Sequence, residues 1–289
     1  MTTSRVIAHV RGDRPGPTLI LIGGVHGNEP AGVVAARTVL AGIAPADVTG
    51  EAIAIVGNLR AIAAGKRYIE RDLNRMWTAE RATGGIEAVE CAELSAVVDE
   101  VRARATGPVH VVDLHSTSAE GFPFAVVGAS EASQAFARQF PLTGIVGLEQ
   151  HLPGVLTGYL GGLGCITIAI EGGQNATPAA AANLEACVTL ALAATVAPGL
   201  AGVTAAREHL THARGELPHT IEIVSRHAIR PEDFFRMEPG FANIQRTAVG
   251  TLLARDYRGE IRAPFDGVVL LPLYQPQGDD GFFYGRAIN

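Results

Sequence analysis

The pattern of hydrophobic and polar positions predicts alternating strands and helices over the first two thirds of the chain. Five apolar runs have the length and composition of buried strands; they cover residues 17–24, 52–58, 109–114, 124–127 and 166–170. Helical spacing is found over residues 29–40 and 87–104, and a further helix is predicted over 179–197. Such alternation predicts an α/β fold with a mostly parallel mixed sheet flanked by helices.

The pattern changes after about residue 210. Short strand-like runs replace the long helical periodicity, and prolines and glycines separate them; the runs are 220–224, 251–253, 260–262 and 267–271. We therefore predict two domains, a larger α/β domain over residues 1–212 and a smaller all-β domain over residues 213–289.

Composition narrows the class of protein. Hydrophobic residues make up 47% of the 289 residues and charged residues 18%, a balance opposite to that of a disordered chain. The formal net charge of −6 argues against a broad electrostatic contact with nucleic acid or anionic lipid. We expect neither as a partner.

Cysteine usage and the N-terminus bear on the compartment. The three cysteines form no CxxC pair, which suits a reducing environment. The first 16 residues carry charge early and have no long apolar core, so we expect no signal peptide. The apolar stretch 188–206 is broken by Pro198 and Gly199, and we interpret it as a helix ending in a loop. We expect a cytoplasmic protein.

Polar residues follow three of the predicted strands. They are His26 with Glu29, then His115, then Glu171. In open α/β sheets, ligands bind beyond the carboxyl ends of the strands. Two imidazoles and one carboxylate form a ligand set that zinc uses in catalytic sites, with the fourth position left open for water.

Context separates this ligand set from a chance pattern. An isolated HxxE is more often a surface pair, but here glycines at positions 23, 24 and 27 bracket His26 at the end of a buried strand. Glu171 is either a charge that leaves the strand for solvent or a general base. Asp113, two residues before His115, is expected on the other face if the strand continues, which disfavours it as a partner that supports His115.

A dense charged segment covers residues 67–75. It holds three arginines, Asp72 and Asn74 in nine residues. One interpretation is a solvated, salt-bridged loop. The other is an anion site, because arginine binds carboxylates through two parallel hydrogen bonds.

Four segments together resemble the aspartoacylase/succinylglutamate desuccinylase family, which has a zinc carboxypeptidase-like fold. They are GGVHGNEPAG at 23–32, NLRAIAAGKRYIERDLNRMW at 58–77, DLHSTS at 113–118 and IEGG at 170–173, in the order of the family. The family also has a smaller C-terminal β-domain.

The resemblance implies a role for each candidate residue. His26, Glu29 and His115 would bind one zinc ion per chain. Glu171 would act as the base and Arg67 would stabilise the oxyanion. Asn74 and Arg75 would hold a substrate carboxylate, and Tyr284 would reach the cleft from the β-domain. Asp72 is expected to orient an arginine.

One departure bears on the substrate. Aspartoacylases carry an arginine about ten residues before the glutamate base, whereas this chain has Gly161 there. Arg138 is the only arginine between residues 116 and 170. The resemblance therefore does not favour N-acetylaspartate.

The leading hypothesis is a zinc-dependent amidohydrolase that removes an N-acyl group from an amino acid or related amine, with a small-molecule N-acyl substrate. A carboxypeptidase-like or ester hydrolase with the same zinc centre is the first alternative. A non-catalytic metal-binding or ligand-binding protein is the alternative from another class. A carrier domain is disfavoured, because the chain's only lysine, Lys66, lies outside the β-domain. The sequence leaves a homo-oligomer open.

Overall fold

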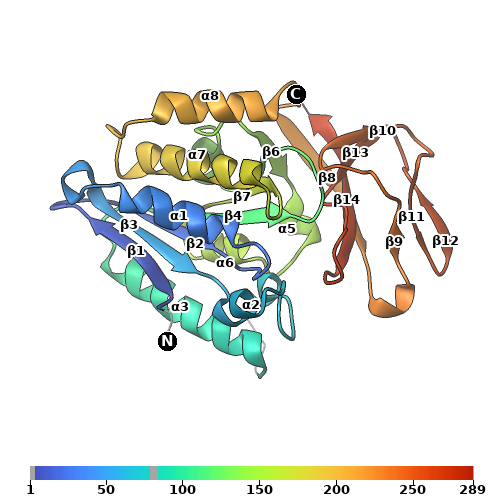
Figure 1. Cartoon of the computed structure of the whole chain (residues 1–289), viewed down its shortest axis with the longest axis horizontal. Helices are drawn as coiled ribbons and strands as arrows, with labels where there is room; N and C mark the ends of the chain where they lie inside the picture. Colours follow the sequence, from blue (N-terminus) through green and yellow to red (C-terminus); the bar gives the residue numbers. More distant parts are fainter. Residues whose placement is uncertain (1–3, 79–83, 289) are drawn as a thin grey trace.

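The computed structural model describes residues 4–78 and 84–288. The outer bounds of the two predicted domains, residues 1 and 289, lie outside these residues. A large sheet with helices on both faces forms one part of the molecule, and a β-rich region continues from one end of it (Figure 1).

Eleven strands form the large sheet. Their order across the sheet is β1 (Val6–Arg11), β3 (Thr49–Val56), β2 (Arg14–Gly23), β4 (Val109–Thr117), β7 (Ile166–Gln174), β5 (Phe124–Val127), β6 (Thr143–Val146), β8 (Thr220–Ala228), β14 (Asp280–Ile288), β13 (Gly267–Leu270) and β10 (Gln245–Thr247). Strands β3, β2, β4 and β7 run parallel, whereas β1 runs antiparallel to β3, and β5 runs antiparallel to β7 but parallel to β6. The predicted mostly parallel mixed sheet is confirmed.

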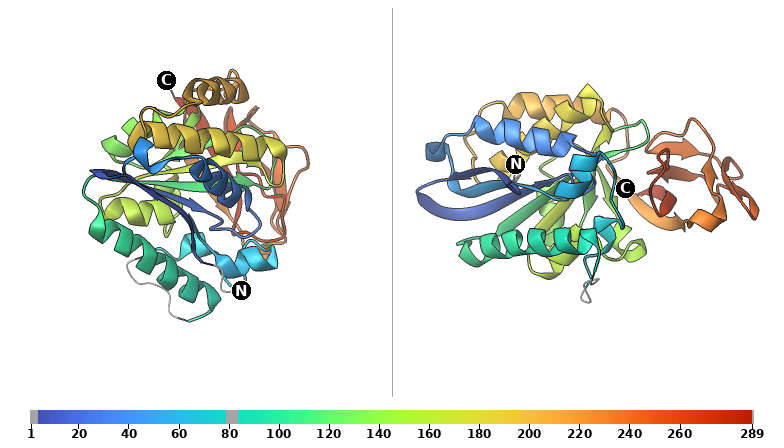
Figure 2. Two further views of the ribbon diagram at one scale, coloured as in Figure 1. Left: turned by 60° about the vertical axis from the view of Figure 1, so that its left-hand side comes forward. Right: turned by 60° about the horizontal axis from the view of Figure 1, so that its bottom comes forward.

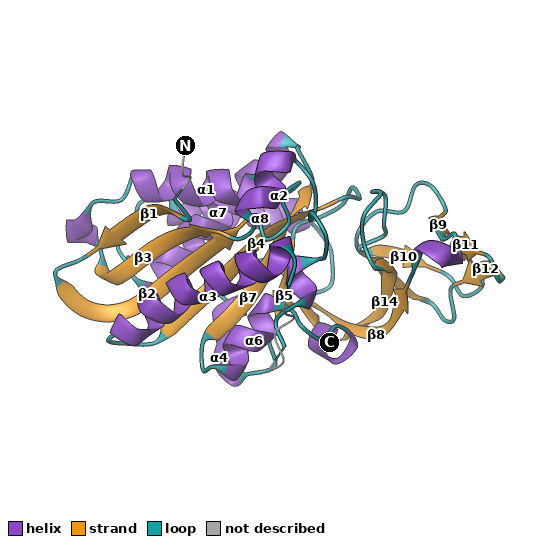
Figure 3. Ribbon diagram, turned by 90° about the horizontal axis from the view of Figure 1, so that it is seen from below, coloured by secondary structure: helices purple, strands orange, loops and turns teal. Residues whose placement is uncertain are grey.

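Helices cover both faces of this sheet (Figure 3). On one face lie α1 (Ala31–Ala41), α7 (Pro178–Thr195) and α8 (Val203–Arg214), over a hydrophobic cluster that includes Leu21 and Leu114. On the other face, α3 (Ile86–Arg104) and α6 (Leu156–Gly162) pack on Ile20, Ile22 and neighbouring residues. The shorter helices are α2 (Leu59–Ala64), α4 (Glu131–Ala137) and α5 (Leu148–His151).

Helix α7 is long and apolar enough, by length and composition, to cross a membrane. It is the one such helix among the residues that the structure describes. It packs against the sheet and against helices α1 and α8, and half of its residues are buried. Its apolar character is therefore explained by its place in the core.

The C-terminal strands continue the large sheet. Strand β8 pairs in parallel with β6 and antiparallel with β14, which pairs in turn with β13. A second sheet of three strands, β9 (Arg236–Met237), β11 (Leu252–Asp256) and β12 (Gly259–Arg262), lies beyond them (Figure 2). The domain boundary at residues 212 and 213 falls within α8 and stays a prediction.

Several elements were not predicted from the sequence, among them β1, β6, α6 and α8, and two predicted strands are longer than expected. Strands β4 and β7 continue beyond the apolar runs and contain His115 and Glu171 themselves. Strand β14 was not predicted, because its sequence DGFFYGRAI has two glycines and no strict alternation. Pairing with β8 and β13 holds it extended.

Candidate functional site

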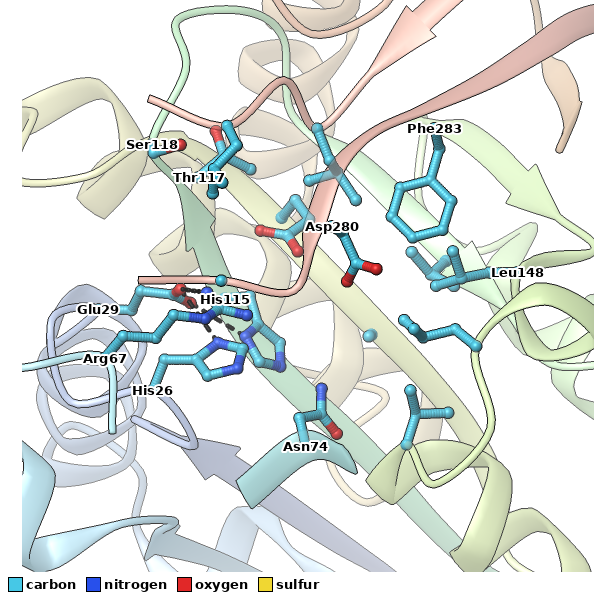
Figure 4. A pocket seen from close by; sticks show the side chains of 18 of the residues that line it. His26, Glu29, Arg67, Asn74, His115, Thr117, Ser118, Leu148, Asp280 and Phe283 are labelled. Carbon is cyan, nitrogen blue, oxygen red and sulfur yellow. Dashed lines mark hydrogen bonds and ion pairs between the residues drawn. The ribbon is translucent and has the colours of Figure 1, made fainter. Parts of the chain in front are cut away.

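The three predicted metal ligands meet at the carboxyl ends of β2 and β4. His26 lies in the turn after β2, Glu29 just before α1, and His115 within β4 (Figure 4). All three side chains are buried, and one ligand atom from each lies within 4.8 Å of the other two.

Two carboxylates hold the outer nitrogens of these histidines. Asp72 Oδ1 is 3.1 Å from His26 Nε2, and Asp113 Oδ2 is 2.9 Å from His115 Nε2. Both Nδ1 atoms consequently face Glu29. Glu29 Oε1 lies 3.1 Å from His26 Nδ1, and Glu29 Oε2 lies 3.0 Å from His115 Nδ1. Histidine ligands of zinc are commonly oriented in this way by a carboxylate on the second nitrogen.

The donor set fits a zinc ion. His26 Nδ1 is buried and lies 3.1 Å from Glu29 Oε1 without the geometry of a hydrogen bond, so this nitrogen is available as a metal donor. Burial alone would raise the pKa of Glu29, but the charges of His26 and His115 and the hydrogen bond of His115 hold it well below its usual range. Glu29 is therefore ionised, as a ligand must be.

The prediction for Asp113 was wrong. Asp113 Oδ2 contacts His115 Nε2, since residues two apart on a strand point to the same face. Burial lowers the pKa of His115, but Asp113 and Glu29 outweigh it and raise that pKa well above its usual value in the absence of a metal. Asp113 therefore positions His115.

Two glycines let the chain place the metal residues together. A Cβ on Gly27 would lie 2.1 Å from the backbone carbon of Ala61 in α2. A Cβ on Gly32 would lie 2.6 Å from the carbonyl oxygen of Leu114. The second contact brings the start of α1, and with it Glu29, against the strand that carries His115.

The charged segment 67–75 lies beside this centre. Arg67 Nη1 is 3.2 Å from Glu29 Oε1, and its Nε and Nη2 donate to Asp72 Oδ2 at 3.2 and 3.0 Å. The expectation that Asp72 orients an arginine is thus confirmed, and Asp72 also bonds His26. The solvated-loop interpretation does not hold for Arg67, whose side chain is 14% exposed.

Glu171 lies next to His115 in the sheet, where β4 and β7 pair these two residues directly. Its Oε2 has no hydrogen-bond partner in the structure, and the residue lines the same pocket as the metal residues. Burial raises its pKa to about 7; His115 opposes that rise and Glu29 adds to it. A carboxyl group that titrates near neutral pH is suited to accept and return a proton.

The pocket has a cavity of about 110 Å³. The metal residues line this pocket, and so do apolar residues that include Val126, Leu148, Val155 and Phe283. Figure 4 shows Asp280 between the metal residues and the pair Leu148 and Phe283. The pocket therefore has a charged end and an apolar end.

Asn74 and Arg75 both line this pocket, as predicted for substrate-binding residues. Asn74 Oδ1 accepts a hydrogen bond from the backbone of Leu156 at 2.8 Å. Arg75 Nη2 forms an ion pair with Asp280 at 2.5 Å, and Asp280 also bonds Arg226. Binding of a substrate carboxylate by Asn74 and Arg75 stays a prediction.

The prediction for Tyr284 needs correction. Tyr284 is buried in the hydrophobic cluster of the C-terminal strands, and its hydroxyl bonds Thr247 and the carbonyl of Phe265, each at 2.7 Å. It does not line the pocket, whereas its neighbour Phe283 does. Adjacent strand residues point to opposite faces, and only the pairing of β14 shows which one faces the site.

Sequence reasoning missed the other pocket residues from the C-terminal segment. Residues 271–273, Gln275 and 278–280 all line the cavity, and Gln275 accepts a hydrogen bond from Asn28 beside the metal centre at 2.8 Å. The run Gly278, Asp279, Asp280 is the one signal in the sequence, a pair of acidic residues at a turn.

Residues 15–197, more than half of the chain, match the family model of the succinylglutamate desuccinylase/aspartoacylase catalytic domain. The chain belongs to this family. The resemblance found in the sequence is thus confirmed.

Curated relatives match over shorter segments. A succinylglutamate desuccinylase of Pseudomonas putida is 36% identical over 85 residues, which is 28% of this chain and 25% of that protein. One from Pseudomonas aeruginosa is 34% identical over 105 residues, 35% of this chain and 31% of that protein. The matched segment thus spans about a quarter to a third of these relatives.

Solved structures match over nearly the whole chain. A succinylglutamate desuccinylase/aspartoacylase from Rhodobacter sphaeroides has a TM-score of 0.73 at 18% identity, over 97% of this chain and 88% of that one. The product-bound ectoine utilization protein EutE (DoeB) from Ruegeria pomeroyi has a TM-score of 0.71 at 21% identity, over 96% and 87%. At this identity the likeness shows a shared fold.

Proposed function

We propose that this protein is a zinc-dependent amidohydrolase that removes an N-acyl group from an amino acid or a related amine. The observation that carries the proposal is the convergence of two buried imidazoles and Glu29 in one pocket with Glu171, whose pKa is raised to about 7. Membership of the desuccinylase/aspartoacylase family supports it.

His26, Glu29 and His115 would hold the metal. Zinc, when bound there, supplies a Lewis acid and a water molecule of lowered pKa. Glu171 Oε2 is free to accept a proton and to deliver it to the leaving amine nitrogen. Arg67, fixed by Glu29 and Asp72, presents a cationic donor beside the ligands for the oxyanion of the acyl group.

The pocket favours a small compound over a peptide. Residues 271–273, Gln275 and 278–280 of the C-terminal segment line the pocket together with the metal residues, and Gln275 bonds Asn28 next to His26, so this segment limits the room beside the metal centre. A carboxypeptidase needs room for an extended chain, so this alternative is less well supported. An ester hydrolase would use the same groups, and a substrate panel separates the two reactions. The cytoplasmic location and the lack of nucleic-acid or membrane partners remain part of this proposal.

The test is the metal content of the purified protein. We expect about one zinc ion per chain in the wild type and less than a tenth of that in His26→Ala, by elemental analysis. His212→Ala changes an exposed histidine outside the site and serves as the matched control, with full metal content. A wild type without metal, or a His26→Ala variant that keeps it, would contradict the zinc centre.

A substrate panel then tests the reaction. It includes N-acetylated neutral amino acids, a matched ester and N-succinylglutamate, the compound in the names of the curated relatives. Release of free amine from any amide member supports the amidohydrolase. A metal-loaded protein that turns over none of them would favour a non-catalytic metal-binding protein.

A further inference from the structure

Arg75 is already engaged by an acidic residue of the chain itself. Its Nη2 is 2.5 Å from Asp280 Oδ2, and its Nη1 donates to the carbonyl of Asn74 at 2.8 Å. Its Nε is buried without a hydrogen-bond partner in the structure. Two of the five N–H donors of this guanidinium are thus engaged, one of them by a carboxylate, the group that arginine binds most strongly.

Asp280 is held in place from both sides. Its second oxygen accepts a hydrogen bond from Arg226 Nε, and its side chain is only 11% exposed. Arg226 comes from β8 and Asp280 from β14, which pair along most of their length. An incoming carboxylate would have to displace a group of the same charge that the fold holds at high effective concentration.

The remaining charges of the pocket give no surplus of positive charge. Arg67 and Arg75 are the arginines among the described residues that line it, and carboxylates pair with both. Asp279 lines the pocket as well, and it forms no ion pair with another of the residues that the structure describes. An apolar wall that includes Leu148 and Phe283 completes this end.

We propose that Asp280 occupies the position of a substrate carboxylate on Arg75, so that the site selects N-acyl compounds whose amine part presents a neutral group there. This inference rests on the proposed function and deepens it. Asp280 acts through Arg75 and is therefore a positioning residue that sets specificity. Removing its charge frees Arg75 to accept a carboxylate.

The test uses four compounds of nearly equal size. They are N-acetylglutamate, its two monoamides and its diamide, which differ only in which carboxylates are replaced by amides. For the zinc-loaded wild type we expect kcat/KM to be at least about tenfold higher for one monoamide than for the diacid. Asp280→Asn should lower that ratio by about tenfold or more.

Two variants serve as controls. Asp280→Glu keeps the charge and should keep the wild-type ratio. Glu222→Gln removes a partly exposed ion pair with Arg286 between the same two strands, away from the pocket, and should leave activity and ratio unchanged. A merely structural role of Asp280 would lower kcat/KM for all four compounds together and leave the ratio as it is.

The preference for a monoamide over the diacid is also measured without turnover, as a ratio of dissociation constants. Binding of glutamate, its two monoamides and its diamide is determined by calorimetry on wild type and Asp280→Asn. Preference of the wild type for the diacid, or an unchanged ratio in folded Asp280→Asn, overturns the inference. Failure to hydrolyse these four N-acetyl compounds and every member of the wider substrate panel would contradict the proposed function instead, while the binding ratio still decides the role of Asp280.

Discussion

The two candidate zinc-binding histidines each carry a carboxylate on the nitrogen that points away from the centre. Asp113 bonds His115, and Asp72 bonds His26 while also accepting two hydrogen bonds from Arg67. These contacts fix the orientation of both rings before any metal binds. Part of the metal affinity should therefore reside in residues that are not ligands.

Asp113→Asn should weaken zinc binding by about 10- to 100-fold, because the amide no longer holds His115 as a carboxylate does. A competition titration with a chromophoric chelator measures the affinity. Asp99→Asn alters an exposed aspartate on α3 and should bind zinc as the wild type does. An unchanged affinity in Asp113→Asn would show that the contact does not matter for the metal.

Glu171→Gln should lower kcat by about 10² or more and leave the zinc content unchanged, because the residue moves a proton and is not a ligand. Steady-state kinetics and elemental analysis on the same sample check both parts. Loss of zinc from this variant would instead make Glu171 a ligand.

The activity should fall as the pH decreases through about 7. The pKa of Glu171 is raised to about 7, so the carboxyl group is protonated below that pH and cannot accept a proton. A bound dication favours the ionised form and shifts the midpoint to lower pH. The dependence of kcat/KM on pH between 5 and 9 checks the direction; a rate that rises toward acid would contradict a basic role.

At the scale of elements, one buried carboxylate of α3 anchors the segment that carries Arg67 and Asp72. Glu87 accepts hydrogen bonds from the backbone N–H groups of residues 69, 70 and 71 at 2.6, 3.0 and 3.2 Å. It also accepts one from Asn58, the N-cap of α2. The irregular residues 67–72 are thereby held at a fixed distance from the metal residues.

Glu87→Gln should lower the free energy of unfolding by about 1–3 kcal/mol. The variant replaces one carboxylate oxygen by an NH2 group, so the backbone N–H groups that this oxygen accepted from lose their acceptor. Urea denaturation measures this change, and kcat should fall with it as Arg67 shifts. Glu100→Gln, on the exposed face of the same helix, should change the stability by less than about 0.5 kcal/mol. Equal effects of the two variants would contradict the anchoring role.

At the scale of the molecule, one sheet joins the two predicted domains. Strand β14 lies between β8 and β13 and also delivers Asp280 and Phe283 to the pocket. The pocket wall and the sheet are therefore parts of the same structure, so one part cannot unfold without removing hydrogen-bond partners from the other.

We expect the metal-free protein to unfold in a single cooperative transition. Because β8 and β14 form the most extensive strand pair of the sheet, both regions should lose structure together. Differential scanning calorimetry checks this through equal calorimetric and van't Hoff enthalpies. Two resolved transitions would show that residues 213–289 form an independent domain.

The sequence by itself determined most of the strand runs of the α/β part, the fold class and the candidate metal residues. His26, Glu29 and His115 were candidates because each lies at or near the end of an apolar strand run, and such ends meet at one edge of a parallel sheet. Glu171 was a candidate by the same rule, and the resemblance to the family supplied the role of each residue. These predictions depend only on where each residue stands relative to an apolar run, which can be read from the sequence directly.

Only the tertiary structure decided which C-terminal residues reach the pocket. Tyr284 was the wrong choice, and Asp280 and Phe283 were missed, because pairing with β8 decides which side chains of β14 face the site. The ion pair between Arg75 and Asp280 joins residues 205 positions apart. No local pattern encodes this contact. It forms only when the folded sheet places β14, the last strand along the chain, near the segment that contains Arg75.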